Sequence, residues 1–230
     1  MKLLFVNGSP KPSVSSSGAI LGSIRAKLGE GHEIAEIRPG MKGQSGSEYR
    51  DLDAIVIAFP LYVDALPSAL LAWMTSFTAG GAGSSGSARD RRGTAVFAVC
   101  NCGFYEGIQT RSALCIVRNF AAKNGLSWRG GLGIGSGGMI EAVAKVPENI
   151  WIKRDVSRGI AAIAQGMLDW GKLSGEDRGA GSLTLGASLR FVNHGLPRFA
   201  YILSAHSGWR TSARRNGLRP EALKARPIPF

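Results

Sequence analysis

A serine-rich segment near the amino terminus has the composition of a phosphate-binding loop. The apolar run at 2–6 stops at Asn7-Gly8-Ser9-Pro10, because the glycine and the prolines prevent a strand or helix from continuing. A serine at 15, 16 or 17 can then cap a helix, whose free N-terminal N–H groups favour an anion. Hydroxyl groups and one cation line the segment at Ser9, Lys11, Ser13, Ser15, Ser16 and Ser17. This composition favours the binding of a phosphate group.

The segment matches neither of two common phosphate-binding fingerprints. It lacks the Gly-x-x-x-x-Gly-Lys-Ser/Thr spacing of a P-loop, and it lacks the Gly-x-Gly-x-x-Gly spacing of dinucleotide-binding proteins. A capped turn that is rich in serine and binds nothing is the alternative interpretation. The phosphate hypothesis therefore depends on the number of serines in one short loop.

Two later loops carry aromatic and amide side chains where a solvated loop would be polar. One loop is Pro60 to Leu66 and the other is Cys100 to Gly107. Tyr62, with Phe104 or Tyr105, could give apolar contact to a flat aromatic ligand, and Asn101 could hydrogen-bond ring heteroatoms. For any one of these residues, covering the end of a sheet or a subunit interface is an equally good explanation.

The elements that must position these loops alternate between apolar strands and amphipathic helices. Strands are predicted at 2–6, 32–37, 53–59, 94–99 and 126–134, the last one broken by Gly130-Gly131. Helices are predicted after the serine-rich loop, from Pro67, after Gly107 and over 152–170. Such an alternation predicts an α/β fold with a doubly wound, five-stranded parallel sheet, and the three loops should converge at its carboxyl edge.

Composition excludes several classes of protein. The chain has 230 residues, 44% of them hydrophobic, so it can form a core and is not a disordered chain. No apolar run approaches the roughly 20 residues of a membrane-spanning helix, and the amino terminus lacks a signal peptide, so a cytoplasmic protein is expected. Three cysteines form neither a disulfide framework nor a compact metal or iron–sulfur ligand set, and no metal site is predicted.

The motifs carry a family resemblance. Gly8-Ser9-Pro10-Lys11 with Ser15-Ser16-Ser17, and Pro60-Leu61-Tyr62 with Leu66-Pro67-Ser68-Ala69-Leu70 at the start of a helix, resemble the NAD(P)H-dependent FMN reductase family of flavodoxin-like proteins. The resemblance covers about residues 1 to 140. Members usually have Ser-Asn-Ser or Ser-Asn-Thr in the first loop, and here Ser16 replaces the asparagine.

This resemblance implies a flavodoxin-like fold, FMN as cofactor, and NADPH or NADH as co-substrate. It assigns the FMN phosphate to Ser9, Lys11, Ser15, Ser16 and Ser17. It assigns the isoalloxazine ring to Pro60, Leu61, Tyr62, Val63, Asn101, Cys102, Gly103 and Tyr105.

The implied activity is an oxidoreductase that passes hydride from nicotinamide through the flavin to a small quinone, flavin, nitro or azo acceptor. The cofactor performs the difficult step, so no catalytic residue is predicted. Cys102 is expected to be a small neighbour of the ring and not a redox thiol. The alternative is a flavodoxin-type electron-transfer protein that works with a redox partner protein. The net charge of +12 would require that partner to be acidic.

A basic carboxyl-terminal extension at 176–230 is expected to follow an FMN-binding domain at 1–175. A Gly-rich linker at 174–188 leads into a helical, amphipathic stretch that runs from Phe191 to His206 and is flanked by arginines. Its apolar face could cover the core, complete a homodimer, or contact an anionic membrane surface peripherally. No nucleic-acid-binding module is recognisable, so no nucleic acid partner is predicted.

Overall fold

The computed structural model describes residues 1–41, 51–82, 93–174, 177–178, 188–219 and 221. The chain divides into two compact units, Met1–Gly195 and Leu196–Phe230. The first unit contains the sheet and all of the candidate site residues, and the second contains one long helix. The predicted division between residues 175 and 176 stays a prediction.

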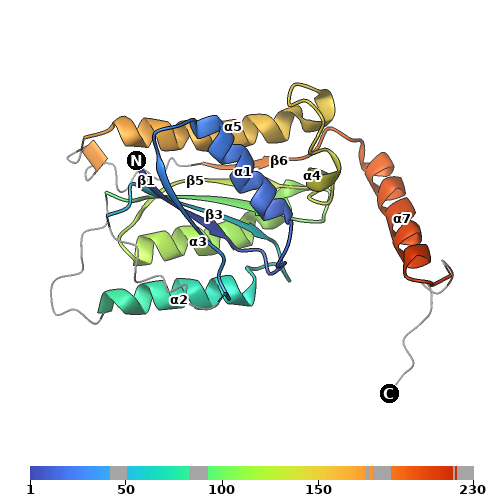
Figure 1. Cartoon of the computed structure of the whole chain (residues 1–230), viewed down its shortest axis with the longest axis horizontal. Helices are drawn as coiled ribbons and strands as arrows, with labels where there is room; N and C mark the ends of the chain where they lie inside the picture. The colour runs from blue at the N-terminus through green and yellow to red at the C-terminus, as the bar shows by residue number, and fades with distance from the viewer. Residues whose placement is uncertain (42–50, 83–92, 175–176, 179–187, 220, 222–230) are drawn as a thin grey trace, which may run out of the picture. The chain divides into compact units, whose positions relative to one another are not determined.

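A six-stranded parallel sheet forms the centre of the first unit (Figure 1). Its order is β2-β1-β3-β4-β5-β6, and its first five strands follow the 2-1-3-4-5 order of flavodoxin-like sheets. The strands are β1 (Lys2–Asn7), β2 (Glu33–Ile37), β3 (Ala54–Pro60), β4 (Ala95–Asn101), β5 (Ser127–Ile134) and β6 (Leu189–Val192). The predicted parallel α/β fold is confirmed.

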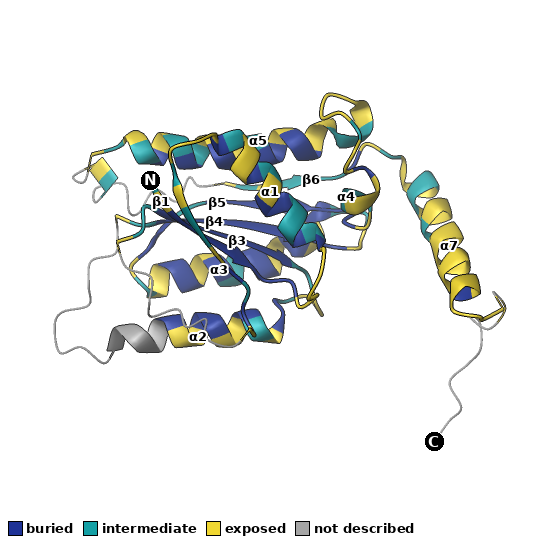
Figure 2. Cartoon of the chain, viewed as in Figure 1, coloured by how far each residue is buried: buried dark blue, intermediate teal, exposed yellow. Residues whose placement is uncertain are grey.

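Helices cover both faces of the sheet (Figures 1 and 2). One face packs against α1 (Ser16–Leu28) and α5 (Trp151–Lys172), and the other packs against α2 (Ser68–Ala82) and α3 (Arg111–Lys123). The central strands β3 and β4 are buried along almost their whole length, as a sheet covered on both faces requires. A short helix, η2 (Gly107–Thr110), precedes α3, and a one-turn helix, α4 (Met139–Ala142), precedes α5.

The helix α1 shows how sequence specifies these elements. Ser15 caps its amino terminus, and Gly29 ends it with a φ of 78°, a backbone angle that glycine adopts without strain. Its buried apolar side chains face the sheet at Ile20, Leu21, Ile24 and Leu28, which are the positions that helical spacing predicts. The carboxyl end of β1 and the amino end of this helix therefore meet at the serine-rich loop.

The prediction of five strands is wrong, because β6 adds a sixth beside β5. The strand has only four residues, too few to show a clear pattern, and it falls within the segment predicted to be the extension. Glycines of β5 make room for its large side chains. A Cβ on Gly131 would lie 2.7 Å from Leu189, and one on Gly133 would lie 2.6 Å from Phe191. Of the two glycines that were predicted to break β5, Gly131 therefore accommodates its neighbour, whereas a Cβ on Gly130 would meet no atom within 4 Å.

Other differences between the predicted and the observed elements are smaller. The helix predicted from Pro67 begins at Ser68 and continues as α2 to Ala82, and residues 83–92 lie outside the described part of the chain. Residues 175–176 and 179–187 of the predicted linker also lie outside it. β5 is continuous, with a register shift opposite Val96 and Phe97 of β4.

The second unit contains helix α7 (Arg198–Arg215). Large apolar side chains are exposed on this helix at Phe199, Ile202, Leu203 and Trp209. Phe191, which the sequence pattern placed on the same face, belongs instead to β6. Among the described residues, no helix has the length and apolar character to cross a membrane.

Candidate functional site

The first loop is folded around buried polar groups at the end of β1. Asn7 is buried, and its Oδ1 accepts a hydrogen bond of 3.2 Å from the Ser9 N–H. Ser9 is buried as well, and its Oγ accepts from the Lys11 N–H at 3.3 Å. Across the loop, the Arg38 guanidinium donates to the carbonyls of Lys11 and Pro12 at 2.8 and 2.7 Å. The loop is therefore fixed by side chain to backbone hydrogen bonds before any ligand is considered.

Besides Ser9, two more of the five predicted phosphate ligands already have structural partners. Ser15 is buried, and its Oγ caps α1 by accepting from the Gly18 N–H at 3.1 Å. Ser17 is buried, and its Oγ lies 3.5 Å from Oδ1 of Asn101 in the third loop. Both side chains therefore hold the loop in shape, and Ser17 also ties it to the end of β4.

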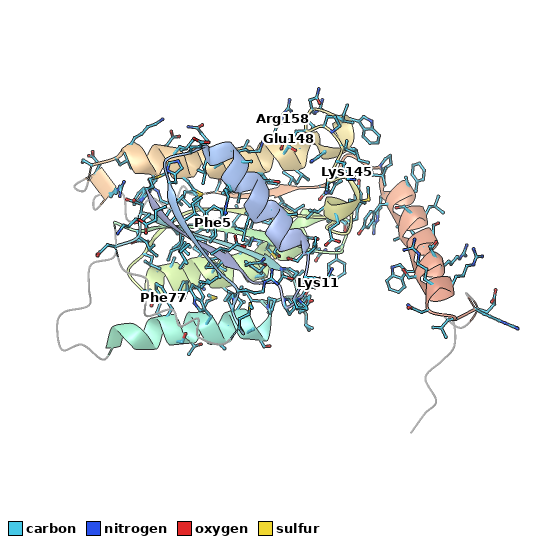
Figure 3. All side chains as sticks on the ribbon, in the orientation of Figure 1. Phe5, Lys11, Phe77, Lys145, Glu148 and Arg158 are labelled. Atoms are coloured by element: carbon cyan, nitrogen blue, oxygen red, sulfur yellow. The ribbon has the colours of Figure 1, made fainter. Side chains whose placement is uncertain are left out.

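The remaining two donors hold an anionic oxygen in this structure. Oε1 of Glu141, in α4, accepts a hydrogen bond of 3.2 Å from Ser16 Oγ. The same oxygen lies 3.7 Å from Lys11 Nζ. A carboxylate thus stands where the sequence predicts a phosphate, which shows that Lys11 and Ser16 can meet at one negatively charged oxygen. Figure 3 shows Lys11 at the end of the sheet where the first loop leaves β1.

The second loop makes a tight turn that points apolar side chains outward. Tyr62 and Ala65 exchange two backbone hydrogen bonds of 3.0 Å, and the two residues between them have positive φ. Val63 has a φ of 47° and Asp64 one of 59°, the pattern of a type I′ turn. Val63 is 98% exposed and Tyr62 46% exposed. Pro60 and Leu61 lie half-buried at the base of the turn.

The third loop combines buried polar groups with one exposed aromatic ring. Asn101 and Cys102 are buried, and a Cβ on Gly103 would meet no atom within 4 Å. Phe104 is 56% exposed, whereas Tyr105 is half-buried. Of the two aromatic residues that the sequence left as alternatives, Phe104 is therefore the more available for ligand contact.

Burial controls the chemistry of the Cys102 thiol. Desolvation raises the pKa of Cys102 to about 11, partly offset by its contact with the Phe104 carbonyl and reinforced by the nearby Glu106. Its Sγ lies 3.8 Å from the Phe104 carbonyl oxygen and 3.7 Å from that of Glu106. A thiol in this environment is protonated at neutral pH and is a poor nucleophile.

Backbone hydrogen bonds join the predicted loops at one edge of the sheet. The Leu61 N–H donates to the Asn101 carbonyl at 2.8 Å, which links the second loop to the third. A fourth loop, after β5, contributes two more links. The Gly137 N–H donates to the Cys102 carbonyl at 2.7 Å, and the Ser136 N–H donates to the Phe104 carbonyl at 2.6 Å. The predicted convergence of the three loops is present, and the fourth loop completes it.

Sequence reasoning missed four residues that shape this site: Asn7, Arg38, Ser136 and Glu141. The sequence could have indicated Asn7, because a polar residue at the end of a buried strand faces the carboxyl edge of the sheet. Ser136 lies in Gly135-Ser136-Gly137-Gly138, a segment whose composition indicates a turn. Arg38 and Glu141 had no local signal, since only the tertiary fold brings them to the first loop.

Comparison with known proteins places this arrangement among solved structures. No family model and no curated protein matches the sequence. The azoreductase AzrA matches at a TM-score of 0.50 and 14% identity, over 74% of this chain and 100% of that one. Oxidised flavodoxin 1 from Bacillus cereus matches at 0.50 and 17%, over 76% and 100%. An oxidoreductase from Corynebacterium diphtheriae matches at 0.54 and 12%, over 76% and 99%.

The chain has a flavodoxin-like fold. In such folds, ligands bind beyond the carboxyl ends of the strands at the point where the strand order reverses, which lies between β1 and β3. The first and second loops follow these two strands. The candidate site therefore lies at the position where this fold places its ligand.

Proposed function

We propose that this chain binds FMN at the carboxyl edge of its sheet and works as an NAD(P)H-dependent oxidoreductase with a small electron acceptor. The observation that carries the proposal is the meeting of Lys11 and Ser16 at one anionic oxygen, at the switch point of a flavodoxin-like sheet. The oxidoreductase and azoreductase among the similar solved structures support the class of reaction through the fold alone.

The first loop would hold the phosphate. Lys11 supplies a cation, and Ser16 supplies a hydroxyl donor. Ser9, Ser15 and Ser17 are buried, and their hydrogen bonds keep the loop and the amino end of α1 in place. In this proposal Lys11 and Ser16 contact the ligand. Ser15 and Ser17 do not contact it, and their hydrogen bonds maintain the shape of the phosphate site.

The second and third loops would hold the flavin ring. Tyr62, Val63 and Phe104 expose large apolar surfaces to solvent, and a flat aromatic ligand would cover them. A ligand can approach Gly103 closely, because no atom lies within 4 Å of the position that a Cβ would take there. The same surface would be supported by five further residues: Pro60, Leu61, Asn101, Cys102 and Tyr105.

The protein's role in the reaction is to bind the flavin, to fix its orientation and to exclude water from it. FMN, when bound, can accept hydride from NADPH or NADH and pass electrons to a quinone, flavin, nitro or azo compound. The residues around the ring would exclude water and fix its orientation. Cys102 would remain a neutral, apolar wall, because its raised pKa keeps the thiol protonated. No side chain of this site needs to act as a general acid or base.

Steady-state turnover tests the proposal. The purified chain, loaded with FMN, should oxidise NADPH or NADH when a quinone is supplied. The Lys11→Ala variant should need about tenfold more FMN to reach the same rate, because a charged phosphate contact is lost. Arg25→Ala is the matched control, since Arg25 pairs with Glu36 and lies nine residues beyond Ser16 in α1, about 14 Å along the helix axis.

Two results would contradict this proposal in different ways. A chain that binds FMN and is reduced by a protein partner, but by neither nicotinamide nucleotide, would be an electron carrier of the flavodoxin type. A chain that binds no FMN would be neither an FMN reductase nor a carrier.

A further inference from the structure

Glu141 occupies the proposed phosphate position with its own negative charge. It belongs to α4, which follows the fourth loop, whereas Lys11 and Ser16 belong to the first loop and α1. One carboxylate oxygen, Oε1, meets both the Ser16 hydroxyl and the Lys11 ammonium group. A phosphate monoester would seek the same two donors. Because two like charges cannot share one small site without repulsion, carboxylate and phosphate exclude each other there.

We propose that Glu141 is an internal competitor for the phosphate-binding loop. In the free protein its carboxylate satisfies Lys11 and Ser16, and a phosphate group must displace it. This inference rests on the proposed phosphate site and assigns Glu141 a role in its affinity and specificity. A ligand with a dianionic phosphate can overcome the competitor, whereas a singly charged carboxylate ligand gains less from the same exchange.

The exposure of the pair makes displacement feasible. The Glu141 side chain is 44% exposed and that of Lys11 is 58% exposed. Both ends can therefore rotate into water, where an ion pair contributes little and each charge is well hydrated. A buried carboxylate in the same place would block the site permanently. The observed geometry is that of a contact which can open.

The backbone that carries Glu141 is held from both sides. The Met139 N–H donates to the Ser136 carbonyl at 2.8 Å, which starts the one-turn helix at the fourth loop. After the helix, Lys153 Nζ donates to the carbonyls of Ala144 and Val146, both at 3.0 Å. Displacement is therefore expected to move the Glu141 side chain and to leave α4 in place.

Glu148 offers a matched control. It pairs with Lys27, in the last turn of α1, and Figure 3 shows it well apart from Lys11. Lys27 lies 11 residues beyond Ser16 in the same helix, a separation of about 16 Å along the axis. This distance exceeds the Debye length of about 8 Å at physiological salt. Glu148→Gln therefore removes the same charge without acting on the phosphate position.

The experiment compares FMN and riboflavin affinity in three proteins by quenching of flavin fluorescence. Glu141→Gln can still accept the Ser16 hydrogen bond but carries no charge, so we expect it to bind FMN about three- to tenfold more tightly than the unchanged chain. Riboflavin has no phosphate, so its affinity should stay within about twofold. Glu148→Gln should bind both ligands as the unchanged chain does.

Two results would overturn the inference. FMN affinity that is unchanged or weaker in Glu141→Gln would mean that Glu141 does not compete and only positions Lys11 and Ser16. An equal gain for FMN and riboflavin would mean that its effect does not act on the phosphate.

A titration with inorganic phosphate tests this inference independently of the proposed function. If no variant binds FMN, the proposed function fails, but competition can still be measured from the amide resonances of Ser16, Ser17 and Gly18 during a phosphate titration. The inference requires these resonances to shift at a lower phosphate concentration in Glu141→Gln than in Glu148→Gln. Equal titration curves would overturn it.

Discussion

Cys102 illustrates how burial decides what a residue can do. Its position beside the exposed aromatic surface invites a redox or nucleophilic role, and its environment argues against one. With a pKa of about 11, the thiol is almost entirely protonated at physiological pH. The folded protein therefore favours the neutral thiol, and this part of its stability falls as the pH rises above the thiol's ordinary pKa toward 11.

Alkylation by iodoacetamide tests this environment. At pH 8 the native Cys102 should react roughly 100-fold or more slowly than the same thiol in the urea-unfolded chain, because the thiolate is the reactive form. Its rate should then rise about tenfold per pH unit as the pKa is approached. Mass spectrometry of the labelled peptide gives both rates. Native labelling at pH 8 as fast as in the unfolded chain would contradict the assigned environment.

Val63 carries backbone strain in the second loop. A β-branched residue with a φ of 47° is unfavourable, and the type I′ turn that it occupies prefers glycine, asparagine or aspartate. We expect Val63→Gly to raise the free energy of unfolding by about 1 kcal/mol while weakening FMN binding, because the apolar side chain is lost. Urea unfolding and flavin titration measure the two effects.

Val14→Gly serves as its control. Val14 is also strongly exposed, at 79%, but it is not among the described non-glycine residues with positive φ. Glycine at position 14 should therefore give no gain in stability. A Val63→Gly variant that is less stable than the unchanged chain would show that the turn is not strained.

At the scale of elements, the junction of β1 and α1 sets the position of the first loop. Gly8 lies at this junction, and its N–H donates to the Ala58 carbonyl at 2.8 Å. A Cβ there would lie 2.8 Å from the Phe59 Cβ and 2.8 Å from a Leu70 methyl group. Phe59 Cβ is fixed by the backbone of β3, so the clash cannot be relieved by a simple rotation.

Gly8→Ala should therefore lower the free energy of unfolding by about 1–3 kcal/mol, as overpacking commonly does. Gly22→Ala, in the middle of α1, should raise it by about 1 kcal/mol, since no atom lies within 4 Å of the new Cβ and alanine is the better helix former. Urea titration of both variants measures the difference. Equal stability of the two variants would contradict the packing of β1 against β3 at this point.

The alternation of apolar runs predicted most of these elements correctly. The strands β1, β3 and β4 are buried on both faces and appear in the sequence as continuous apolar runs ended by polar or turn residues. β6 could not be recognised in this way. Its four residues are too few to show a clear burial pattern. Leu189 and Phe191 also need the glycines of β5 to accept their side chains, a condition that only the tertiary structure reveals.

The candidate site was predictable in its location and less so in its details. The alternation of strands and helices predicted that three loops would meet, because parallel strands end at one edge. The different roles of the serines in the first loop depend on long-range contacts. Ser17 faces Asn101 and Ser16 faces Glu141, which lie 84 and 125 residues away in sequence. No local pattern encodes such contacts.

At the scale of the whole molecule, both compact units are basic. Residues 1–195 hold 21 lysines and arginines against 15 acidic residues, and residues 196–230 hold 7 against one, Glu221. The second unit thus reaches the same net charge, +6, with far fewer residues. An anionic partner for α7 would be favoured by charge, whereas contact between two copies would have to depend on its apolar side chains.

Truncation after Gly195 tests the role of the second unit. All of the candidate flavin ligands and all six strands lie before this point, so the shortened chain should bind FMN within about twofold of the full chain. We expect its oligomeric order by light scattering to fall, because the exposed face of α7 is expected to complete a homodimer. The measurement pairs flavin titration with light scattering.

Vesicle sedimentation tests the alternative role of α7, which is contact with an anionic membrane surface. A shortened chain that remains dimeric but no longer sediments with anionic lipid vesicles would instead assign α7 to a membrane surface. Loss of FMN binding on truncation would show that the first unit does not hold the complete site.

Calorimetric titration of the purified chain with FMN tests the central claim most directly. If the carboxyl edge of this sheet is a flavin site, one FMN should bind per chain with a dissociation constant below about 10 µM. Lys11→Ala should weaken that binding about tenfold, and Arg25→Ala should leave it unchanged. Absence of measurable heat or of any change in flavin fluorescence at tens of micromolar FMN, roughly the range in which a specific cofactor site would saturate, would contradict the account.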